Sequence, residues 1–152
     1  MAKNEYLRFQ RSNYIVRDID RSLTFYRDVL GFEVAFLKDS PDDSYSYPVF
    51  EIERAHKLRF AVLSTEEQVR VMALTEVPVE LEPQAMPRRS AIVLEVADVD
   101  AIIAGATAAG LHVYEEEELH THDGRVGREV GIVDFDDNLV VIYHIPKAGS
   151  AS

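Results

Sequence analysis

Apolar residues recur along this chain at two spacings, and these predict strands and helices in alternation. Residues 13–16 and 91–96 are short, rich in β-branched or aromatic side chains, and each is closely followed by an aspartate, so both are predicted strands. The apolar spacing then changes from two to three or four, which predicts a helix after each strand. The buried faces of these helices are expected to be Ile19, Leu23, Tyr26 and Leu30 in the first, and Val99, Ile102, Ile103 and Ala106 in the second.

Each predicted helix has a start signal and a stop signal. Asp18 and Asp98 can accept hydrogen bonds from the first free backbone amides, and their charge complements the helix dipole. Gly31 and Gly110 follow the helices, where a left-handed residue commonly ends them. The signals come in the same order twice, because residues 16–20, Val-Arg-Asp-Ile-Asp, recur as residues 96–100, Val-Ala-Asp-Val-Asp.

After each helix the pattern returns to strands. The second half offers 112–119, 128–133 and 139–145, with a tight turn at 136–138, and the first half offers 33–37, 58–63 and 69–77. We take 69–77 as the last strand of the first half, because the linker that remains, 78–89, then has an ordinary length. Residues 44–53 are read either as an edge strand, where Pro48 is tolerated, or as a flap over an apolar ligand, and the edge strand is favoured.

The repeat therefore predicts an α+β fold. Two βαβββ modules, residues 7–77 and 90–146, are expected to form one domain over residues 1–152, with 78–89 as their linker. Their strands would make a curved mixed sheet around a cleft, with the helices outside. Such a concave surface, lined by alternate residues of several strands, is the expected binding site.

Composition and charge limit the classes of partner that the chain is expected to bind. The chain of 152 residues has a formal net charge of −11 and no cysteine. An acidic surface repels phosphate backbones, so we expect neither nucleic acid nor a membrane as partner. Without cysteine there are no disulfides, thiolate nucleophiles or sulfur ligands for a metal. Residues 1–5 lack the apolar core of a signal peptide, which favours a cytoplasmic location.

Two segments resemble the vicinal oxygen chelate (VOC) superfamily, which includes glyoxalases, bleomycin resistance proteins and extradiol dioxygenases. Residues 16–32, Val-Arg-Asp-Ile-Asp-Arg-Ser-Leu-Thr-Phe-Tyr-Arg-Asp-Val-Leu-Gly-Phe, are similar to its first helix. Residues 134–139, Asp-Phe-Asp-Asp-Asn-Leu, look like its turn into the last strand. The resemblance implies a small-molecule site between modules and a homodimer. It does not settle the chemistry, because one fold hosts many activities.

The resemblance also implies where a metal would be held. Metal-dependent members place His or Gln at the start of each module's first strand and Glu in each last strand. The corresponding positions here hold Arg11, Ala91 and Val141, and the fourth lies within 69–77. A permanent cation and two side chains without donor atoms cannot bind a metal, so we predict no cofactor.

Strand alternation gives a candidate ligand site once Arg11 is placed on the cleft face. The set is Arg11, Asn13, Glu95 and Tyr143 as polar groups, with Ala91 and Val141 as apolar walls. A forked guanidinium suits an anionic or carbonyl group of a small organic ligand. The same residues allow a simpler interpretation, in which Arg11 and Glu95 form an internal ion pair.

The sequence is compatible with two hypotheses about activity. One hypothesis is a binding or sequestration protein without the family metal. The other is a lyase or dioxygenase with a relocated metal or with Glu95 as general base, although a neighbouring Arg11 would work against a base. His120 and His122 could contribute to a metal site, but the acidic run before them is more typical of a solvated hairpin.

Overall fold

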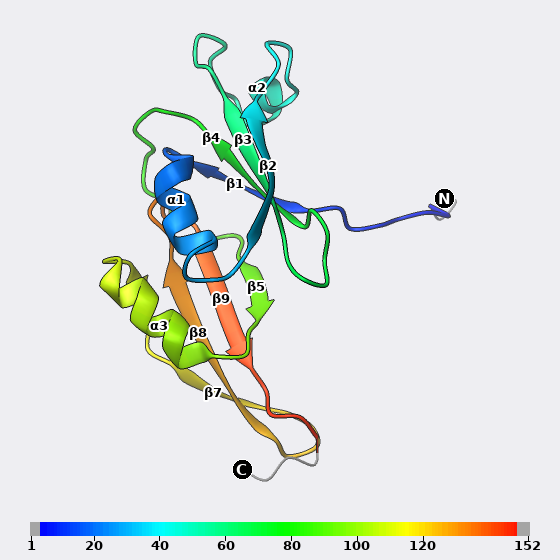
Figure 1. Cartoon of the computed structure of the whole chain (residues 1–152), viewed down its shortest axis with the longest axis vertical. Coiled ribbons are helices and arrows are strands. Elements are labelled where there is room, and N and C mark those ends of the chain that lie inside the picture. The colour runs from blue at the N-terminus through cyan, green and yellow to red at the C-terminus, as the bar shows by residue number, and fades with distance from the viewer. Residues whose placement is uncertain (1–3, 149–152) are drawn as a thin grey trace.

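A computed structural model of the chain describes residues 4–148. Residues 1–3, part of the stretch searched for a signal peptide, and residues 149–152 lie outside the described residues. The elements are, in order, β1 (Ser12–Val16), α1 (Ile19–Tyr26), β2 (Glu33–Asp39), α2 (Ser46–Val49), β3 (Arg59–Ser64), β4 (Met72–Glu76), β5 (Ile92–Glu95), α3 (Val99–Ala108), β6 (His112–Val113), β7 (Glu117–His120), β8 (Val126–Val133) and β9 (Leu139–His144). Figure 1 shows two sheets along the long axis, with α1 and α3 on the same side of the molecule.

The strands belong to two mixed sheets, one for each module. The first has the order β1-β4-β3-β2, and the second has the order β5-β9-β8-β6, with β7 also paired to β8. In both, the first strand of the module runs parallel to the last, as β1 does to β4 and β5 to β9. The α+β class is confirmed, and 69–77 does contain the last strand of the first module.

The helices form where the capping aspartates predict them. Asp18 accepts a hydrogen bond from the amide of Arg21, and Asp98 accepts one from the amide of Ala101. Beneath them, one continuous apolar core joins both sheets. Its members include Leu23 and Tyr26 of α1, Ile102 of α3, Leu74 of β4 and Ile142 of β9. We call this covered side of each sheet the helix side, and the opposite side its inner face.

The first helix is shorter than its apolar spacing predicts. It ends at Tyr26, and Leu30 lies beyond it. The amides of Asp28 and Leu30 bond to the carbonyls of Leu23 and Phe25, five residues back, so this last turn is wider than an α-helical turn. Gly31 then reverses the chain direction with φ +97°. Gly110, at φ +79°, directly follows the C-cap of α3 as predicted.

Of the predicted strands, one is wrong and another is interrupted. Residues 44–53 contain no edge strand, because the segment folds into the short helix α2 and buries Tyr47 against Leu58 and Val77. Residues 112–119 are divided into β6 and β7. Tyr114 still bonds to Gly131 and Glu117 pairs with Glu129, so three steps on one strand face two on the other, a one-residue bulge.

One tyrosine connects the two modules where β5 and β9 begin. The Tyr14 hydroxyl donates to the carbonyl of Leu139 at 2.6 Å and accepts from the amide of Ile92 at 2.8 Å. At the corresponding place in module one, the amide of Ser12 bonds directly to the carbonyl of Val71 at 3.0 Å. In module two, the first hydrogen-bonded link between β5 and β9 is therefore made through a hydroxyl that module one supplies. Burial raises the pKa of Tyr14, which keeps this group protonated.

Candidate small-molecule site

The inner face of module one combines aromatic rings with cations. Phe36 pairs with Val62, Lys38 pairs with Phe60, and Phe60 pairs with Thr75, so their side chains share this face. The rings of Phe36 and Phe60 meet edge to face at 5.8 Å between centroids. Lys38 Nζ lies 5.2 Å and 5.5 Å from the two centroids, within the range of cation–π attraction.

The inner face of module two carries a row of acidic side chains. Glu95 pairs with Tyr143, Tyr143 with Glu129, and Glu129 with Glu117, which makes one row across four strands. The Tyr143 hydroxyl donates to Glu95 at 3.1 Å, and this hydrogen bond raises the pKa of Tyr143. The neighbouring row is apolar and open, since Val93, opposite Val141, is 62% exposed.

Asn13, one of the polar residues predicted for the site, has, in the described part of the chain, one side-chain atom that is paired and one that is not. Its Oδ1 accepts a hydrogen bond from Thr75 at 2.8 Å, while its Nδ2 is buried and has no partner among the described residues. A buried donor left unpaired costs on the order of 1–3 kcal/mol. The structure thus holds a free N–H on the inner face of β1.

The predicted set is divided between the two sheets. Glu95, Tyr143 and Val141 lie together on module two, whereas Asn13 lies on β1 of module one. Arg11 and Ala91 are exposed and immediately precede β1 and β5. The ion pair between Arg11 and Glu95 is not found among the described residues, because Glu95 is instead in register with Tyr143 and accepts its hydroxyl.

Strand pairing identifies the fourth expected ligand position. Val141 pairs with Val93 in module two, and the repeat equivalent of Val93 is Asn13, which pairs with Ala73. Ala73 therefore occupies in β4 the place that Val141 occupies in β9. Arg11, Ala73, Ala91 and Val141 together offer no oxygen or imidazole donor, so these residues do not fit the family metal.

The histidines of the described residues do not form an alternative metal site. His120 lies on β7 and His122 in the exposed turn after it, and His120 Nε2 is 3.0 Å from Glu118. Within residues 4–148, no group of three or more His, Asp or Glu side chains is arranged to hold a metal ion. The prediction of a solvated hairpin fits this geometry.

The register of two arginines, left open by the sequence, is resolved. Arg59 points to the helix side and pairs with Glu76 at 2.8 Å and Asp20 at 3.3 Å. Arg70 stands 5.7 Å from the centroid of Phe36, on the inner face. Sequence reasoning missed this cluster of Arg70, Lys38 and two phenylalanines. The alternation of Phe36 with Lys38 was the available signal, but it identified a face only once the strand pairing was known.

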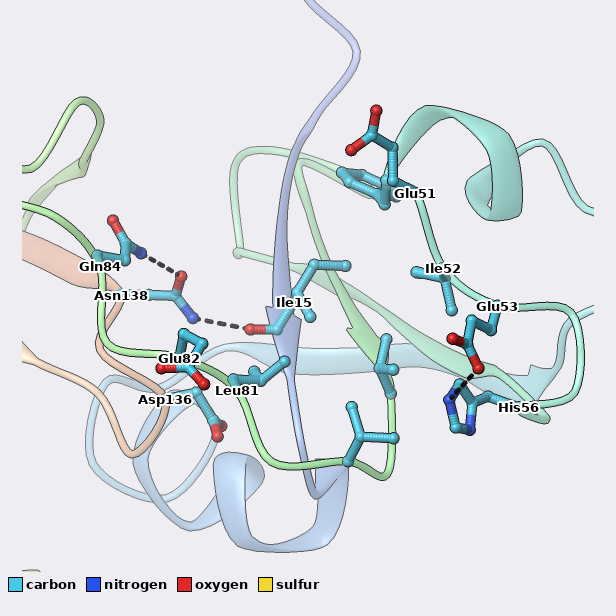
Figure 2. Close-up of a pocket in the computed structure, with 13 residues that line it drawn as sticks. Ile15, Glu51, Ile52, Glu53, His56, Leu81, Glu82, Gln84, Asp136 and Asn138 are labelled. Atoms are coloured by element: carbon cyan, nitrogen blue, oxygen red, sulfur yellow. Dashed lines mark hydrogen bonds and ion pairs between the residues drawn. The ribbon is translucent and has the colours of Figure 1, made fainter.

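The turn into β9 borders a cavity beside β1. Asp134 is buried and accepts hydrogen bonds from Tyr26, the amides of Asp136 and Asn138, and the Asn138 side chain. Burial raises the pKa of Asp134 despite these donors. The Asn138 amide group donates to the carbonyl of Ile15 at 3.0 Å, which ties the turn to module one (Figure 2).

The family model described as Glyoxalase/Bleomycin resistance protein/Dioxygenase superfamily matches residues 8–142. No curated protein matches the sequence. No helix among the described residues is long and apolar enough to cross a membrane.

Three solved structures illustrate the likeness of fold. A glyoxalase family protein from Bacillus cereus has 16% identity and a TM-score of 0.74, covering 97% of this chain and 99% of its own. The trypanothione-dependent glyoxalase I of Leishmania major has 21% identity and a TM-score of 0.61, with coverage of 91% and 87%. A fosfomycin resistance protein from Listeria monocytogenes has 14% identity and a TM-score of 0.57, with coverage of 89% of both chains. From the matched family model, this chain belongs to the Glyoxalase/Bleomycin resistance protein/Dioxygenase superfamily.

Proposed function

We propose that the protein binds a small organic molecule on its inner sheet faces, without the family metal centre. Arg11, Asn13, Glu95 and Tyr143 are the polar groups of this site, and Ala91 and Val141 are apolar walls. The observation that carries the proposal is the buried, unpaired Nδ2 of Asn13. A carbonyl or carboxylate oxygen of a ligand would satisfy this donor.

The donor chemistry supports binding without a metal. At the four expected positions a metal would meet one guanidinium and three aliphatic side chains, and a catalytic site needs about three protein ligands. The alternative function, a lyase or dioxygenase with a relocated metal, needs a new group of donors. None is formed by the described residues. No step of a reaction is assigned to the chain.

We further propose that two copies complete the site as a homodimer. The inner face of module one is cationic and aromatic, whereas that of module two is acidic and leaves Val93 largely exposed. Opposite charges favour placing one copy's first module against its partner's second. Sedimentation equilibrium should give a dimer that Val93→Asp weakens. A wild-type monomer at all concentrations would contradict this part.

The ligand proposal is tested with benzoate as the probe and Asn13→Asp as the variant. The change keeps the shape of the side chain but replaces the free N–H donor with an acceptor oxygen. We expect benzoate affinity, measured by NMR titration, to fall about tenfold or more, which corresponds to about 1.4 kcal/mol. Asn4→Asp, an exposed residue, adds the same charge and should change the affinity less than about twofold.

Two results would contradict the proposal. One is equal benzoate affinity in the wild type and Asn13→Asp. The other is stoichiometric binding of zinc, nickel or manganese by the purified protein, since such a metal would require donors that the four positions do not supply.

A further inference from the structure

One cavity is lined by none of the polar groups of the proposed site. It has a volume of about 490 Å³ and opens where the inner face of β1 meets the linker and the segment after α2. Figure 2 shows Glu51, Ile52, Glu53 and His56 on one side of Ile15, and Leu81, Glu82, Asp136 and Asn138 on the other. The volume is in the range of pockets that hold small organic ligands.

The lining of this cavity has one sign of charge. Its carboxylates are Glu51, Glu53, Glu82 and Asp136, its imidazole, His56, lies 3.9 Å from Glu53, and no lysine or arginine lines it. The remaining wall is largely apolar, with Ile15, Phe50, Ile52, Val77, Val79 and Leu81. Carboxylates above an apolar floor favour a ligand that combines a positive charge with a hydrocarbon body.

Asp136 lines the cavity with its charge already paired to two arginines. Its side chain is fully buried, with 0% of its surface exposed. Oδ1 accepts from Arg17 at 2.9 Å and from Arg21 at 3.3 Å, whereas Oδ2 accepts no hydrogen bond in the described structure. Arg17 and Arg21 balance the charge of Asp136, so Glu51 and Glu82 are the lining carboxylates without an ion-pair partner among the described residues.

Glu51 stands at a position that the backbone would give to glycine. It follows α2 with φ +54°, and the amide of the next residue, Ile52, bonds back to Tyr47 at 2.9 Å to close the helix. A left-handed residue with a side chain costs on the order of 1–2 kcal/mol. The chain nevertheless carries a carboxylate there, at the cavity wall.

From these observations we propose that the cavity binds an organic cation, an amine or quaternary ammonium with an apolar body. The carboxylates of Glu51 and Glu82, on opposite walls, attract the charged group, and the apolar body lies on Ile15 and Ile52. This site goes beyond the proposed function, because it takes a ligand of opposite charge and uses none of the polar residues assigned there.

The test uses benzyltrimethylammonium as the cation and benzenesulfonate as an anion of similar size. In NMR titrations of the full chain, the cation should shift the amides of residues 50–53, 81, 82 and 84 in a saturable way, and the anion should not. Comparable saturable binding of both probes at these amides, or no saturation by the cation at millimolar concentration, would overturn the proposal.

Glu51→Gly separates binding from folding. The substitution removes a carboxylate and also relieves the left-handed backbone, so the melting temperature should stay the same or rise. Affinity for the cation should fall about 3- to 10-fold, as expected for one exposed carboxylate within a few ångströms of a charge. Glu66→Gly, in an exposed loop, removes the same charge and should leave the affinity within about twofold.

A further variant and a further probe make the result specific. Glu82→Lys reverses a charge on the opposite wall and should weaken the cation more than Glu51→Gly does. Benzoate should leave the amides of residues 50–53 unshifted, which distinguishes failure of this proposal from failure of the benzoate site. If Glu51→Gly and Glu66→Gly bind the cation equally, the assignment of the cavity is wrong.

Discussion

Equivalent places in the two modules can be compared through strand pairing, since Asn13 pairs with Ala73 as Val93 pairs with Val141. On the helix side the two sheets agree, with buried aliphatic residues such as Leu74 and Ile142 facing a shared core. On the inner faces they differ, because module one has Lys38 and Arg70 over aromatic rings and module two has a row of glutamates.

This difference shows which part of the repeat determines the fold and which part is free to vary. The helix side must fill a common apolar interior, so its residue types are restricted in both modules. The inner faces carry no such packing requirement across most of module two, and there the residues set charge and binding. Substitutions on the two faces and at the contacts between the modules test this division.

The largest effect is expected from two neighbours on β9. Ile142→Ala removes a side chain that is fully buried on the helix side, and should lower the free energy of unfolding by about 2–5 kcal/mol. Val141→Ala, on the inner face, should cost less than about 1 kcal/mol. Urea unfolding of both variants measures the contrast. Equal losses would mean that the inner face is packed as tightly as the core.

Tyr14→Phe tests the hydroxyl by which module one completes module two. The substitution leaves the Ile92 amide and the Leu139 carbonyl without their shared partner, and should cost about 1–3 kcal/mol of unfolding free energy. Hydrogen exchange of the Ile92 amide should become faster. Tyr143→Phe removes a hydroxyl that bonds only to the exposed Glu95, so a loss as large as that of Tyr14→Phe would contradict the comparison.

The turn into β9 gives a pH dependence with a defined sign. Arg88 lies 2.6 Å from Asp137 and lowers the pKa of that carboxyl, so the pair stabilises the protein above pH 4 and this contribution is lost as pH falls through the lowered pKa. Asp137→Asn should cost about 0.5–1 kcal/mol at pH 7 and nothing at the acid end. Unfolding free energies from pH 7 downward test this. A constant difference would exclude the ionic cause.

Asp134 in the same turn should act in the opposite direction. Burial raises its pKa, so the folded state binds a proton more readily than the unfolded chain between that raised pKa and about 3.9. As the pH falls through this window, protonation of Asp134 raises the free energy of unfolding. The stabilising contribution of Asp137 is lost only at lower pH. Asp134→Asn should remove the gain from the same unfolding series.

The smallest effect on stability is expected for Arg70→Gly. Arg70 has φ +55°, so glycine relieves its backbone, and the greater freedom of glycine in the unfolded chain offsets this gain to within about 0.5 kcal/mol. The cation above Phe36 is lost, and the inner face of module one becomes less positive. Thermal unfolding should show little change. A loss above about 1 kcal/mol would mean that the guanidinium stabilises the fold.

Much of the architecture is local and was accessible from the sequence. Capping at Asp18 and Asp98 depends on hydrogen bonds to residues three positions away. The sequence repeat predicts the second module once the first has been recognised. The segment 44–53 could not be placed in this way. Its alternating hydroxyl and aromatic residues suit a strand, but Tyr47 packs against Leu58 and Val77, distant contacts that override the local preference.

The candidate site was less accessible, because it depends on register. Ala73 was identified only through its pairing with Asn13, and the Tyr14 hydroxyl between Ile92 and Leu139 leaves no signal in the pattern of a strand. The buried Nδ2 of Asn13 also depends on which neighbours lie within reach. Alternation predicts the face on which a side chain lies, but not the partners that it lacks.

The hydrogen bond from Asn138 to the carbonyl of Ile15 has a consequence for the behaviour of the protein in concentrated solution. β1 ends its sheet, and the outer backbone groups of an end strand are available to a strand of another chain. The Asn138 side chain occupies one of these groups from within the molecule. The turn into β9 thereby blocks one point at which β-aggregation could begin, and Asn138→Ala would leave that carbonyl open to a foreign strand.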